Sequence, residues 1–555
     1  MGGVAVYGDQ ALLARVAGSA SPEAAQRVHA LRAALGADGR RSIPGYVTLT
    51  VPFDALAVSE SAARARIEAA LAAIGPGVPA AGAGGATRTI VVPVEYGGAA
   101  GPDLDAVAAL AGLSPAETVA LHAGRPYRVY FLGFSPGFAY MGDLVPRLAA
   151  AASRLATPRP RVAGGSVGIA GGQTGVYPRP SPGGWRLLGR TPLCPFDPHR
   201  EPPALFRQGD TVVFAPVGTS GADPGPPLRA REDDPDGILA LHVLRPGLLT
   251  TIQDLGRPGH EADGVPAAGA ADPLAAVLAN RLVGNADGAA VLEITALGPE
   301  LGAARDLEVA IAGADLGAEI DGRRLPPGLA AALPRRAVLS FRGIRAGCRA
   351  YLAVRGGIAS PPVLGSRSAD PLGGIGPPPL RAGGAVRAYR APGRVGDAAG
   401  RRLREGAYAL PARDEPMVAG FVPGPQAEWF EDGWWEGERP VAPASDRVGV
   451  RLGGGAPRRR QPWEGAELLS EGNVLGAVQV PPGGAPLILG AGRPTVGGYP
   501  KPAVLCTVDA WRLAQALPGA ARVRLRPVDA GWARARLAEA RAVLEGPGED
   551  AVRGG

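Results

Sequence analysis

The residues from Gly164 to Thr191 have the composition of a ligand-binding loop. They read GGSVGIAGGQTGVYPRPSPGGWRLLGRT, so glycine and proline alternate with a few polar side chains. Dense glycine marks places where the backbone turns with positive φ or approaches another group closely. Turns alone do not require polar neighbours such as Gln173 and Thr174, so we expect this segment to line a site. The alternative is that its glycines serve only turns.

An aromatic turn upstream, GFSPGFAY at residues 133–140, has two interpretations. In the first, Phe134, Pro136 and Phe138 line a bound ligand. In the second, the turn is rigid and only packs two aromatic rings.

The second half of the chain holds further candidate side chains. Gln253, Asp254 and Arg257 form a compact polar trio in TIQDLGRPG. They either act chemically or contain a self-sufficient Asp–Arg pair that fixes the loop. Glu293 lies in the otherwise apolar VLEITALGP, so it is either an outward-facing residue or a buried functional carboxylate.

Two arginine motifs have the composition of anion sites. They are Arg367 in LGSRSADPLGG and the trio of Ser445, Asp446 and Arg447, although salt-bridged loops would look the same. His260, beside QDLGRPG, is the one histidine we consider for catalysis. Asp272 precedes Pro273 and is predicted to cap a helix rather than to bind metal.

These candidates require a scaffold of several domains. A chain of 555 residues is expected to contain more than one core. Ser21 and Ser59 are predicted to begin two helices of a small α/β domain, and Ser114 with Glu117 forms a capping box. Beyond residue 126 the pattern is mostly short strands and turns, with helices after Asp272 and over 533–544.

The composition argues against several classes of function. The net charge is +7, but Lys501 is the only lysine among 58 basic residues, which indicates codon bias. The arginines are scattered and no recognition helix or zinc pattern accompanies them, so we expect no nucleic-acid partner. Three separated cysteines fit a reduced cytosol, and no apolar window is long enough to span a bilayer. The expected protein is cytoplasmic, without a membrane partner.

Several long segments resemble a known pair of bacterial families. FLGFSPGFAYMGDL and the 164–191 segment are similar to the KipI family, also called the B component of 5-oxoprolinase. The segments that resemble its partner family KipA, or the C component, are GLLTTIQDLGRPGHEADGVPAAGAADPLAAVLANRLVGN, EITALGPEL, SDRVGVRL and GGYPK. The resemblance spans nearly the whole chain and indicates a fused B and C pair.

The resemblance implies a mainly β, multi-domain protein with α/β parts. A small α/β domain at 1–78 would precede a cyclophilin-like β-barrel at 88–219. A linker at 220–237 would lead to two more such barrels, at 238–391 and 392–530, and a closing helix and tail at 531–555.

The resemblance also implies an ATP-dependent 5-oxoprolinase that opens the lactam of 5-oxoproline to glutamate together with a separate A component. Phosphorylation of the lactam oxygen would need backbone N–H groups, arginine forks and Mg²⁺. No GxxxxGK[ST] loop is present, so a nucleotide would be held without a Walker lysine. A homo-oligomer is also possible.

The expected site residues come from all of these segments. The catalytic set is Gln173, Arg190, Asp254, His260, Glu293 and Lys501. The substrate- or nucleotide-binding set is Phe134, Ser135, Pro136, Gly137, Phe138, Ser166, Gly171, Gly172, Thr174, Tyr177, Gln253, Arg257, Arg367, Asp446, Arg447, Gln479, Gly497, Gly498 and Tyr499. We expect the B segment 164–191 and the C segment 476–501 to face one another.

Two other functions stay open. The related carboxyltransferase of urea carboxylase acts on an amide with biotin, but this chain has no biotin-carrier module, because Lys501 lies in GGYPKP. Biotin would therefore arrive in trans. KipI and KipA were named for opposing effects on a sporulation kinase, so kinase regulation is the other alternative. Gly492 stands where these families usually carry an aspartate, which puts full activity in question.

Overall fold

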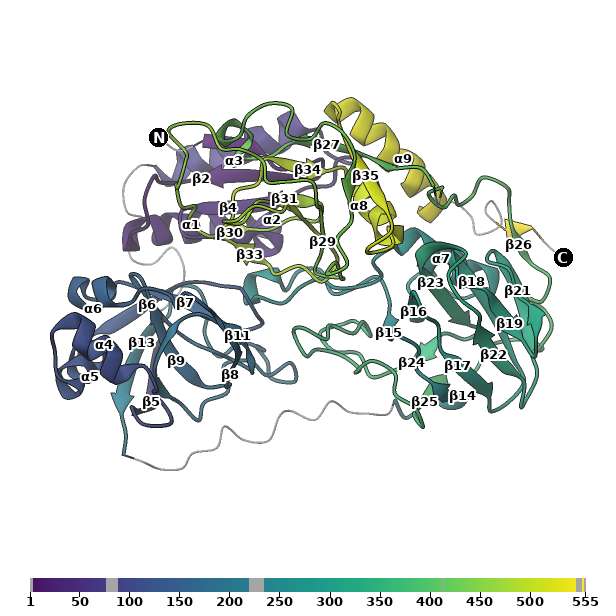
Figure 1. Ribbon diagram of the computed structural model, residues 1–555, viewed down its shortest axis with the longest axis horizontal. Helices are drawn as coiled ribbons and strands as arrows, with labels where there is room; N and C mark the ends of the chain where they lie inside the picture. The colour runs from purple at the N-terminus through teal and green to yellow at the C-terminus, as the bar shows by residue number, and fades with distance from the viewer. Residues whose placement is uncertain (1–2, 76–87, 219–233, 413, 546–551, 554–555) are drawn as a thin grey trace.

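The computed structural model describes residues 3–75, 88–218, 234–412, 414–545 and 552–553. It is 32% strand and 19% helix and contains several separate sheets, so the expected mainly β, multi-domain class is confirmed. Most of the expected linker at 220–237 and part of the tail at 531–555 lie outside the described residues. Figure 1 shows a barrel and a two-sheet domain side by side, with the N-terminal domain and the C-terminal domain packed together above them.

The N-terminal domain is a four-stranded antiparallel sheet covered by helices. Its order is β1-β2-β4-β3. The side chains of Ser21 and Ser59 accept from the N–H groups three residues on, so both expected caps are confirmed. Val28, Leu31 and Ile67 close the core from the helices. The elements are β1 (Gly3–Val6), β2 (Ala11–Arg15), α1 (Pro22–Ala34), α2 (Gly36–Arg41), β3 (Ile43–Pro44), β4 (Thr48–Pro52) and α3 (Glu60–Ile74).

The second domain is a closed seven-stranded barrel in the order β10-β7-β6-β13-β5-β12-β9. The Ser114–Glu117 capping box is present as expected. Its strands are β5 (Thr89–Tyr96), β6 (Pro126–Leu132), β7 (Ala139–Gly142), β9 (Ser166–Ala170), β10 (Gln173–Val176), β12 (Arg186–Arg190) and β13 (Thr211–Pro216). The remaining elements are α4 (Leu104–Ala111), α5 (Pro115–Ala123), α6 (Pro146–Ala151) and the ribbon β8 (Arg159–Val162) with β11 (Ser181–Gly183).

Helices α4 and α5 are bent by 91° relative to each other. Among the described residues they are the one bent pair whose length and composition would suit a membrane span, and no single helix does.

One barrel residue predicts a pH dependence of stability. His122 is buried between the Tyr96 hydroxyl at 2.7 Å and the Thr174 hydroxyl at 2.9 Å, and burial lowers its pKa to about 3. The unfolded chain binds this proton below pH ~6.5 but the folded barrel does not, so acid favours unfolding. The barrel should lose about 2 kcal/mol between pH 7.5 and 5. Hydrogen exchange in β6 and β13 measures this loss.

The matched control for His122 is His242, which is exposed on β14. His122→Gln should remove most of the pH dependence in the barrel, whereas His242→Gln should retain it. An unchanged slope in His122→Gln would contradict the assignment.

The third domain contains two seven-stranded sheets that share one core. Asp272 caps α7 (Pro273–Leu282) through the Ala275 N–H, as expected. One sheet holds β14 (Ile238–Arg245), β17 (Glu300–Ala303), β19 (Ala318–Ile320), β20 (Arg323–Arg324), β22 (Val338–Phe341), β24 (Ile358–Ala359) and β25 (Ala385–Ala388). The other holds β15 (Leu249–Gln253), β16 (Val291–Thr295), β18 (Leu307–Asp315), β21 (Leu329–Leu333), β23 (Ala346–Val354), β26 (Arg402–Leu403) and β36 (Val552–Arg553).

The C-terminal domain is built on one seven-stranded sheet. Its order is β28-β35-β27-β34-β31-β32-β29. The closing helix expected at 533–544 is present as α9 (Ala530–Glu545). The other elements are β27 (Met417–Pro423), η2 (Ala427–Trp429), β28 (Arg439–Pro440), β29 (Gly449–Arg451), β30 (Glu471–Gly472), β31 (Ala477–Gln479), β32 (Leu487–Leu489), β33 (Val496–Gly497), β34 (Ala503–Leu505), α8 (Thr507–Arg512), η3 (Leu513–Gln515) and β35 (Arg522–Pro527).

The hydrogen bonds among the described residues leave the sheets of the third and C-terminal domains open, in contrast to the closed barrel at 89–216. Edge strands such as β20, β24 and β28 are only two residues long.

The N-terminal domain packs directly on the C-terminal domain. The Tyr46 N–H donates to the Ser470 carbonyl at 3.2 Å, and the Thr507 hydroxyl donates to Asp9 at 2.7 Å. Leu13 and Tyr7 share an apolar cluster with Val504. The N-terminal domain and the C-terminal domain are therefore joined, as the purple and yellow-green elements in Figure 1 show.

Candidate functional site

Three expected motifs from different parts of the chain meet at one junction. The loop between β6 and β7 donates the Gly137 N–H to the carbonyl of Asp263, in the turn η1 (Glu261–Asp263), at 2.9 Å. Gly264 has φ 78°, and a Cβ there would lie 2.7 Å from the Ser135 carbonyl oxygen. A Cβ on Gly133 would lie 2.1 Å from Val496 in β33. The glycines at this junction thus permit close contact between domains.

Phe134 lies at this junction in an unusual backbone conformation. Its φ is 67° and its side chain is 39% exposed. Phe138 and Tyr177, also expected at the site, are buried beside it with ring centroids 5.4 Å apart. A bulky residue in the left-handed region costs free energy, and such positions cluster at ligand sites.

Beside this loop lie three charged residues from two domains, Arg179, Arg257 and Asp370. Asp370 is 3% exposed and Arg257 is 2% exposed. The Asp370 Oδ1 atom accepts from the Gly373 N–H at 3.0 Å, but its Oδ2 atom accepts no hydrogen bond from the described residues. The Nη1 atoms of Arg179 and Arg257 likewise have no partner among them. We call these three residues the junction triad.

The junction triad is electrostatically coupled. Burial raises the pKa of Asp370, and the charges of Arg257 and Arg179 oppose that rise. Burial lowers the pKa of both guanidinium groups. Asp370 opposes that change in both, and Asp254 also opposes it in Arg257. Pro136 lies against Gly373, since a Cβ on that glycine would be 3.3 Å from its ring. The loop that carries Asp370 therefore packs directly against the 133–138 loop.

A second charged cluster joins the two C-terminal sequence motifs. Arg447 donates to the Glu293 carboxylate and to the Gly269 carbonyl, and Tyr351 donates to Glu293 at 2.9 Å. The Arg349 Nε atom lies 3.8 Å from the same carboxylate. Burial alone would raise the pKa of Glu293, but the two arginines outweigh it and hold the pKa below its usual range. Glu293 is thus buried and paired with arginines, not outward-facing, while its functional role stays a prediction.

A third cluster surrounds Lys501. Its ammonium donates to Glu471 at 3.0 Å, and both side chains are almost fully buried. Gln426 donates to the same carboxylate at 3.1 Å. Burial lowers the pKa of Lys501, an effect that Glu471 opposes. Gln479, also expected at the site, donates to Asn473 at 3.0 Å close to Gly497.

Asp254 is fully occupied in holding a loop. Its carboxylate accepts from the hydroxyls of Ser366 and Ser368 at 2.6 and 2.5 Å and from the Arg367 N–H at 2.6 Å. Arg257 instead donates to the carbonyls of Val363 and Ser368. Among the described residues no hydrogen bond or ion pair joins Asp254 directly to Arg257. Both hold the loop through Ser368, and the Asp254 charge acts on Arg257.

The glycine-rich segment is divided between two ends of the barrel. The Thr174 hydroxyl donates to the Gly168 carbonyl at 3.1 Å and contacts His122 inside the barrel. These contacts leave Thr174 as a core residue, contrary to the expected binding role. Gly171 and Gly172 form the hairpin turn between β9 and β10, with open space where a Cβ would stand. Only the later part, near Arg179, reaches the junction triad.

The other expected residues are dispersed. Gln173 has an Oε1 atom without a partner among the described residues, and Arg190 donates to the Gly164 carbonyl at 3.2 Å. Asp446 caps its own turn through the Val448 N–H at 2.8 Å. Ser166 and Gln253 are buried, and the Arg367 side chain donates to the Tyr389 hydroxyl. His260 is partly exposed and Tyr499 is exposed. Val496, in segment 476–501, lies against Gly133 of the barrel, while the expected approach of segment 164–191 to it stays a prediction.

Sequence reasoning missed Asp370, Arg179, Glu471 and Arg349. Asp370 stands before Pro371 and has the appearance of a turn residue, while Arg179 is one arginine among many. Only the fold reveals that they carry unpartnered or buried charge.

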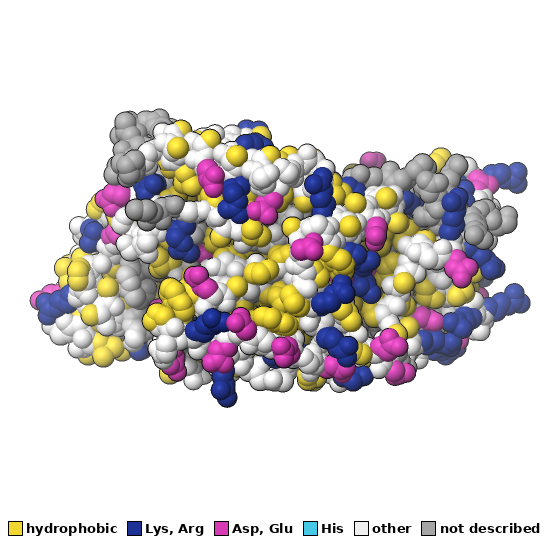
Figure 2. Space-filling view, turned by 90° about the horizontal axis from the view of Figure 1, so that it is seen from above, with side chains coloured by type: hydrophobic (Ala, Val, Ile, Leu, Met, Phe, Trp, Pro, Cys, Tyr) yellow, Lys and Arg dark blue, Asp and Glu magenta, His cyan; other side chains and the backbone are white. Residues whose placement is uncertain are grey.

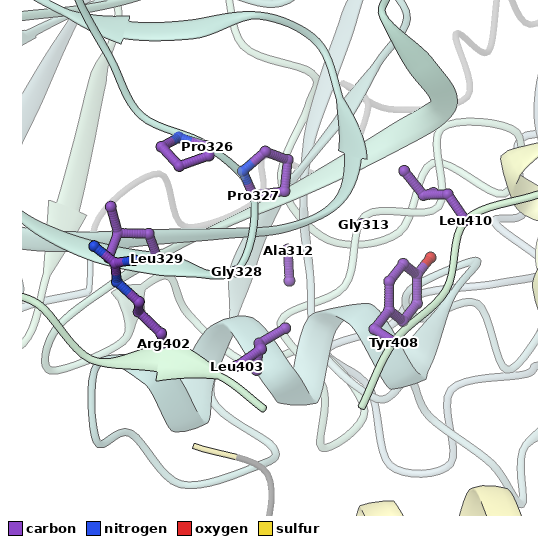
Figure 3. A pocket seen from close by; sticks show the side chains of 10 residues that line it. All are labelled: Ala312, Gly313, Pro326, Pro327, Gly328, Leu329, Arg402, Leu403, Tyr408 and Leu410. Atoms are coloured by element: carbon purple, nitrogen blue, oxygen red, sulfur yellow. The ribbon is translucent and has the colours of Figure 1, made fainter. Parts of the chain in front are cut away.

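A cavity of about 400 Å³ lies elsewhere, on the third domain (Figure 3). Its walls are mostly apolar, from Pro326, Pro327, Leu329, Leu403 and Leu410. Tyr408 at its edge donates its hydroxyl to Asp272. The described residues that line it include no acid, no histidine and no paired arginines, so we place the chemistry at the junction instead.

The described residues contain no group of three or more His, Cys, Asp or Glu side chains placed to hold a metal ion. On the face shown in Figure 2, acidic and basic side chains are interspersed among apolar ones.

Comparison with known proteins divides the chain into the same two parts. The carboxyltransferase domain, subdomain C and D, matches residues 3–206, and the carboxyltransferase domain, subdomain A and B, matches residues 263–527. The chain is 55% identical over 130 residues to the B subunit of 5-oxoprolinase from Escherichia coli O157:H7, a match that covers 23% of this chain and 59% of that one. It is 33% identical over 294 residues to the C subunit of 5-oxoprolinase from Escherichia coli K12, covering 50% of this chain and 87% of that one.

A solved structure matches both parts at once. The crystal structure of TTHA0988 has a TM-score of 0.78 and 38% identity to this chain. The match covers 93% of this chain and 99% of that one. The arrangement of four domains in one chain is therefore shared with a known protein.

Proposed function

Because this chain belongs to the carboxyltransferase-domain family, with subdomains C/D preceding A/B, we propose that it is a fused B and C component of an ATP-dependent 5-oxoprolinase. The observation that carries the proposal is the junction: motif loops from both parts meet around buried arginines and a carboxylate. The names of the two 5-oxoprolinase relatives supply the reaction.

The chemistry of the reaction suits the junction. In such a reaction ATP phosphorylates the lactam oxygen and leaves as ADP. Water then adds to the activated carbon, the C–N bond breaks to open the ring, and phosphate leaves to give glutamate. The substrate is a small anion with an amide N–H, and its carboxylate needs fixed cationic donors. Arg179 and Arg257 each offer an Nη1 atom without a partner among the described residues, and Phe134 and Pro136 provide apolar surface beside them. These side chains would bind and orient the substrate.

A separate A component is part of the proposal. This sequence lacks a Walker loop, and its described residues offer no ready metal cluster. ATP with Mg²⁺ would therefore be bound jointly with the partner or mainly by it. The chain alone should be inactive or weak.

Reconstitution tests the proposal. The purified chain is mixed with a 5-oxoprolinase A component, ATP, Mg²⁺ and L-5-oxoproline, and glutamate and ADP are measured by chromatography. We expect the two products in equal amounts, with little of either when the chain or the A component is omitted. A positive control uses the same A component with separate B and C components. Absence of turnover where that control is active would contradict the proposal.

The family description favours one second candidate, a biotin-dependent carboxyltransferase. Biotin would arrive on a carrier protein, since the chain has one lysine and that lysine is buried. Incubation with carboxybiotinylated carrier and urea, or another amide, distinguishes the two. Transfer of labelled carboxylate without glutamate formation would favour this candidate.

A further inference from the structure

The unpartnered atoms of the junction triad assign it a ligand. We propose that Arg179, Arg257 and Asp370 bind a small carboxylate that also carries an amide N–H, with the carboxylate on the arginines and the N–H on Asp370 Oδ2. This inference rests on the proposed function and names the substrate subsite within it. In 5-oxoproline the two groups are held on one five-membered ring.

The first argument is the cost of leaving these atoms unpartnered. Asp370 Oδ2, Arg257 Nη1 and Arg179 Nη1 are all buried polar atoms without a hydrogen bond from the described residues. A buried polar group left unpaired costs about 1–3 kcal/mol, and more when charged. Asp370 Oδ2 lies against Gly373, Arg179 Nη1 lies against the adjacent Gly374, and Arg257 binds Ser368 two residues before Asp370. Three such atoms on one short loop are explained if a ligand pairs with them.

The second argument is charge. Within the triad two guanidinium groups are coupled to one carboxylate, which leaves one excess positive charge, although the Asp254 carboxylate also acts on Arg257. The nearby Arg447 does not add to it, because Glu293 pairs with that guanidinium. Asp254 is held by two hydroxyls and a backbone N–H, so the paired arginines of the triad are the cationic donors open to an anionic ligand. Arginine is also the side chain best suited to bind a planar carboxylate.

The third argument is how the fold positions the arginines. Arg257 is fixed by the carbonyls of Val363 and Ser368. Arg179 comes from the barrel and lies over the backbone of Gly374, where a Cβ would be 2.1 Å from its Nη1 atom. Gly374 has φ 64°, so the loop needs glycine there both for its conformation and for this contact.

Apolar side chains near the triad suit the ring carbons of the ligand. Leu372, on the same loop as Asp370, is 55% exposed, and Phe134 is 39% exposed on the loop of Pro136. Exposed apolar side chains beside buried charges suit the methylene groups of a small ring. Because Arg179 and Asp370 belong to different family domains, the subsite exists only when the B and C parts are joined.

Calorimetry on the full chain, without the A component or ATP, tests the subsite. We expect L-5-oxoproline to bind. Cyclopentanecarboxylate lacks the N–H and 2-pyrrolidinone lacks the carboxylate, and each should bind at least tenfold more weakly. Inorganic phosphate should also bind at least tenfold more weakly. Preference for phosphate would overturn the proposal and assign an oxyanion site instead.

Two substitutions test the residues. Arg179→Gln and Asp370→Asn should each weaken L-5-oxoproline binding at least tenfold. Their matched controls, Arg161→Gln and Asp236→Asn, change exposed residues outside the triad and should bind as the parent does. Thermal unfolding verifies that each variant is folded. If a variant does not fold, the comparison of ligands on the parent chain still tests the subsite.

The outcomes separate this inference from the proposed function. If L-5-oxoproline does not bind, or if Arg179→Gln binds it as the parent does, the subsite is wrong even where reconstitution yields glutamate. If binding follows the expected order but reconstitution fails, the subsite stands and the ATP-dependent reaction is wrong.

Discussion

Glu293→Gln is expected to destabilise the third and C-terminal domains by about 3–5 kcal/mol, because it leaves two buried arginines without their counter-charge. Arg447 donates to Glu293 from another domain, and Arg349 lies 3.8 Å away. Glutamine keeps the shape but supplies only a neutral oxygen. Urea unfolding followed by hydrogen exchange in β16 and β23 measures the loss.

The control for this substitution is Glu300→Gln. Glu300 pairs with Arg245 at 2.5 Å, but that arginine is largely exposed, so the pair should contribute only about 0–1 kcal/mol. A loss in Glu293→Gln as small as in this control would contradict the buried-pair assignment.

The difference in unfolding free energy between the parent and Glu293→Gln should depend on pH, which gives a second measurement. The pKa of Glu293 is lowered in the folded chain, so its ion pair stabilises fully above the unfolded pKa of ~4.3. As the pH falls below that value and through the folded pKa, the stabilisation is lost. The difference between the parent and Glu293→Gln should therefore be constant from pH 8 to 5 and shrink below about 4.5.

Local sequence patterns predicted the local structure well. Ser21, Ser59, Ser114 and Asp272 each cap the helix they were expected to cap. A cap depends on a few neighbouring residues, so the chemistry that fixes it is contained in the sequence. The same is true of the short strands separated by turns, which predicted the mainly β class.

Contacts between distant segments could not be predicted in the same way. Glu293 and Arg447 were separate candidates, and nothing in either motif indicates that they pair across 154 positions. The Asp370 carboxylate becomes notable only because its loop buries it beside an arginine from the barrel. Thr174 shows the opposite error, since a polar residue among glycines can equally be a hydrogen-bonded core residue.

Lys501→Met should destabilise the contact between the N- and C-terminal domains by about 3–5 kcal/mol, because Glu471 is left buried without its ammonium partner. Glu471 lies in β30, which contacts β4 of the N-terminal domain, and the Thr50 hydroxyl donates to the adjacent Gly472 carbonyl at 3.3 Å. Hydrogen exchange in β4 should therefore increase in this variant. The double variant Lys501→Met with Glu471→Leu should recover most of the loss, since an apolar pair can replace a buried ion pair.

Lys501→Arg tests why this chain keeps a single lysine. Its ammonium is fully buried and lies 3.0 Å from Glu471, so a larger planar guanidinium would have to displace its neighbours and find partners for more N–H groups. We expect a loss of about 1–3 kcal/mol, as for other overpacked sites. Arg161→Lys, the reverse change at an exposed position, should be neutral. If Lys501→Arg is also neutral, codon bias would suffice to explain the rarity of lysine, and the buried pair would not require a compact charge.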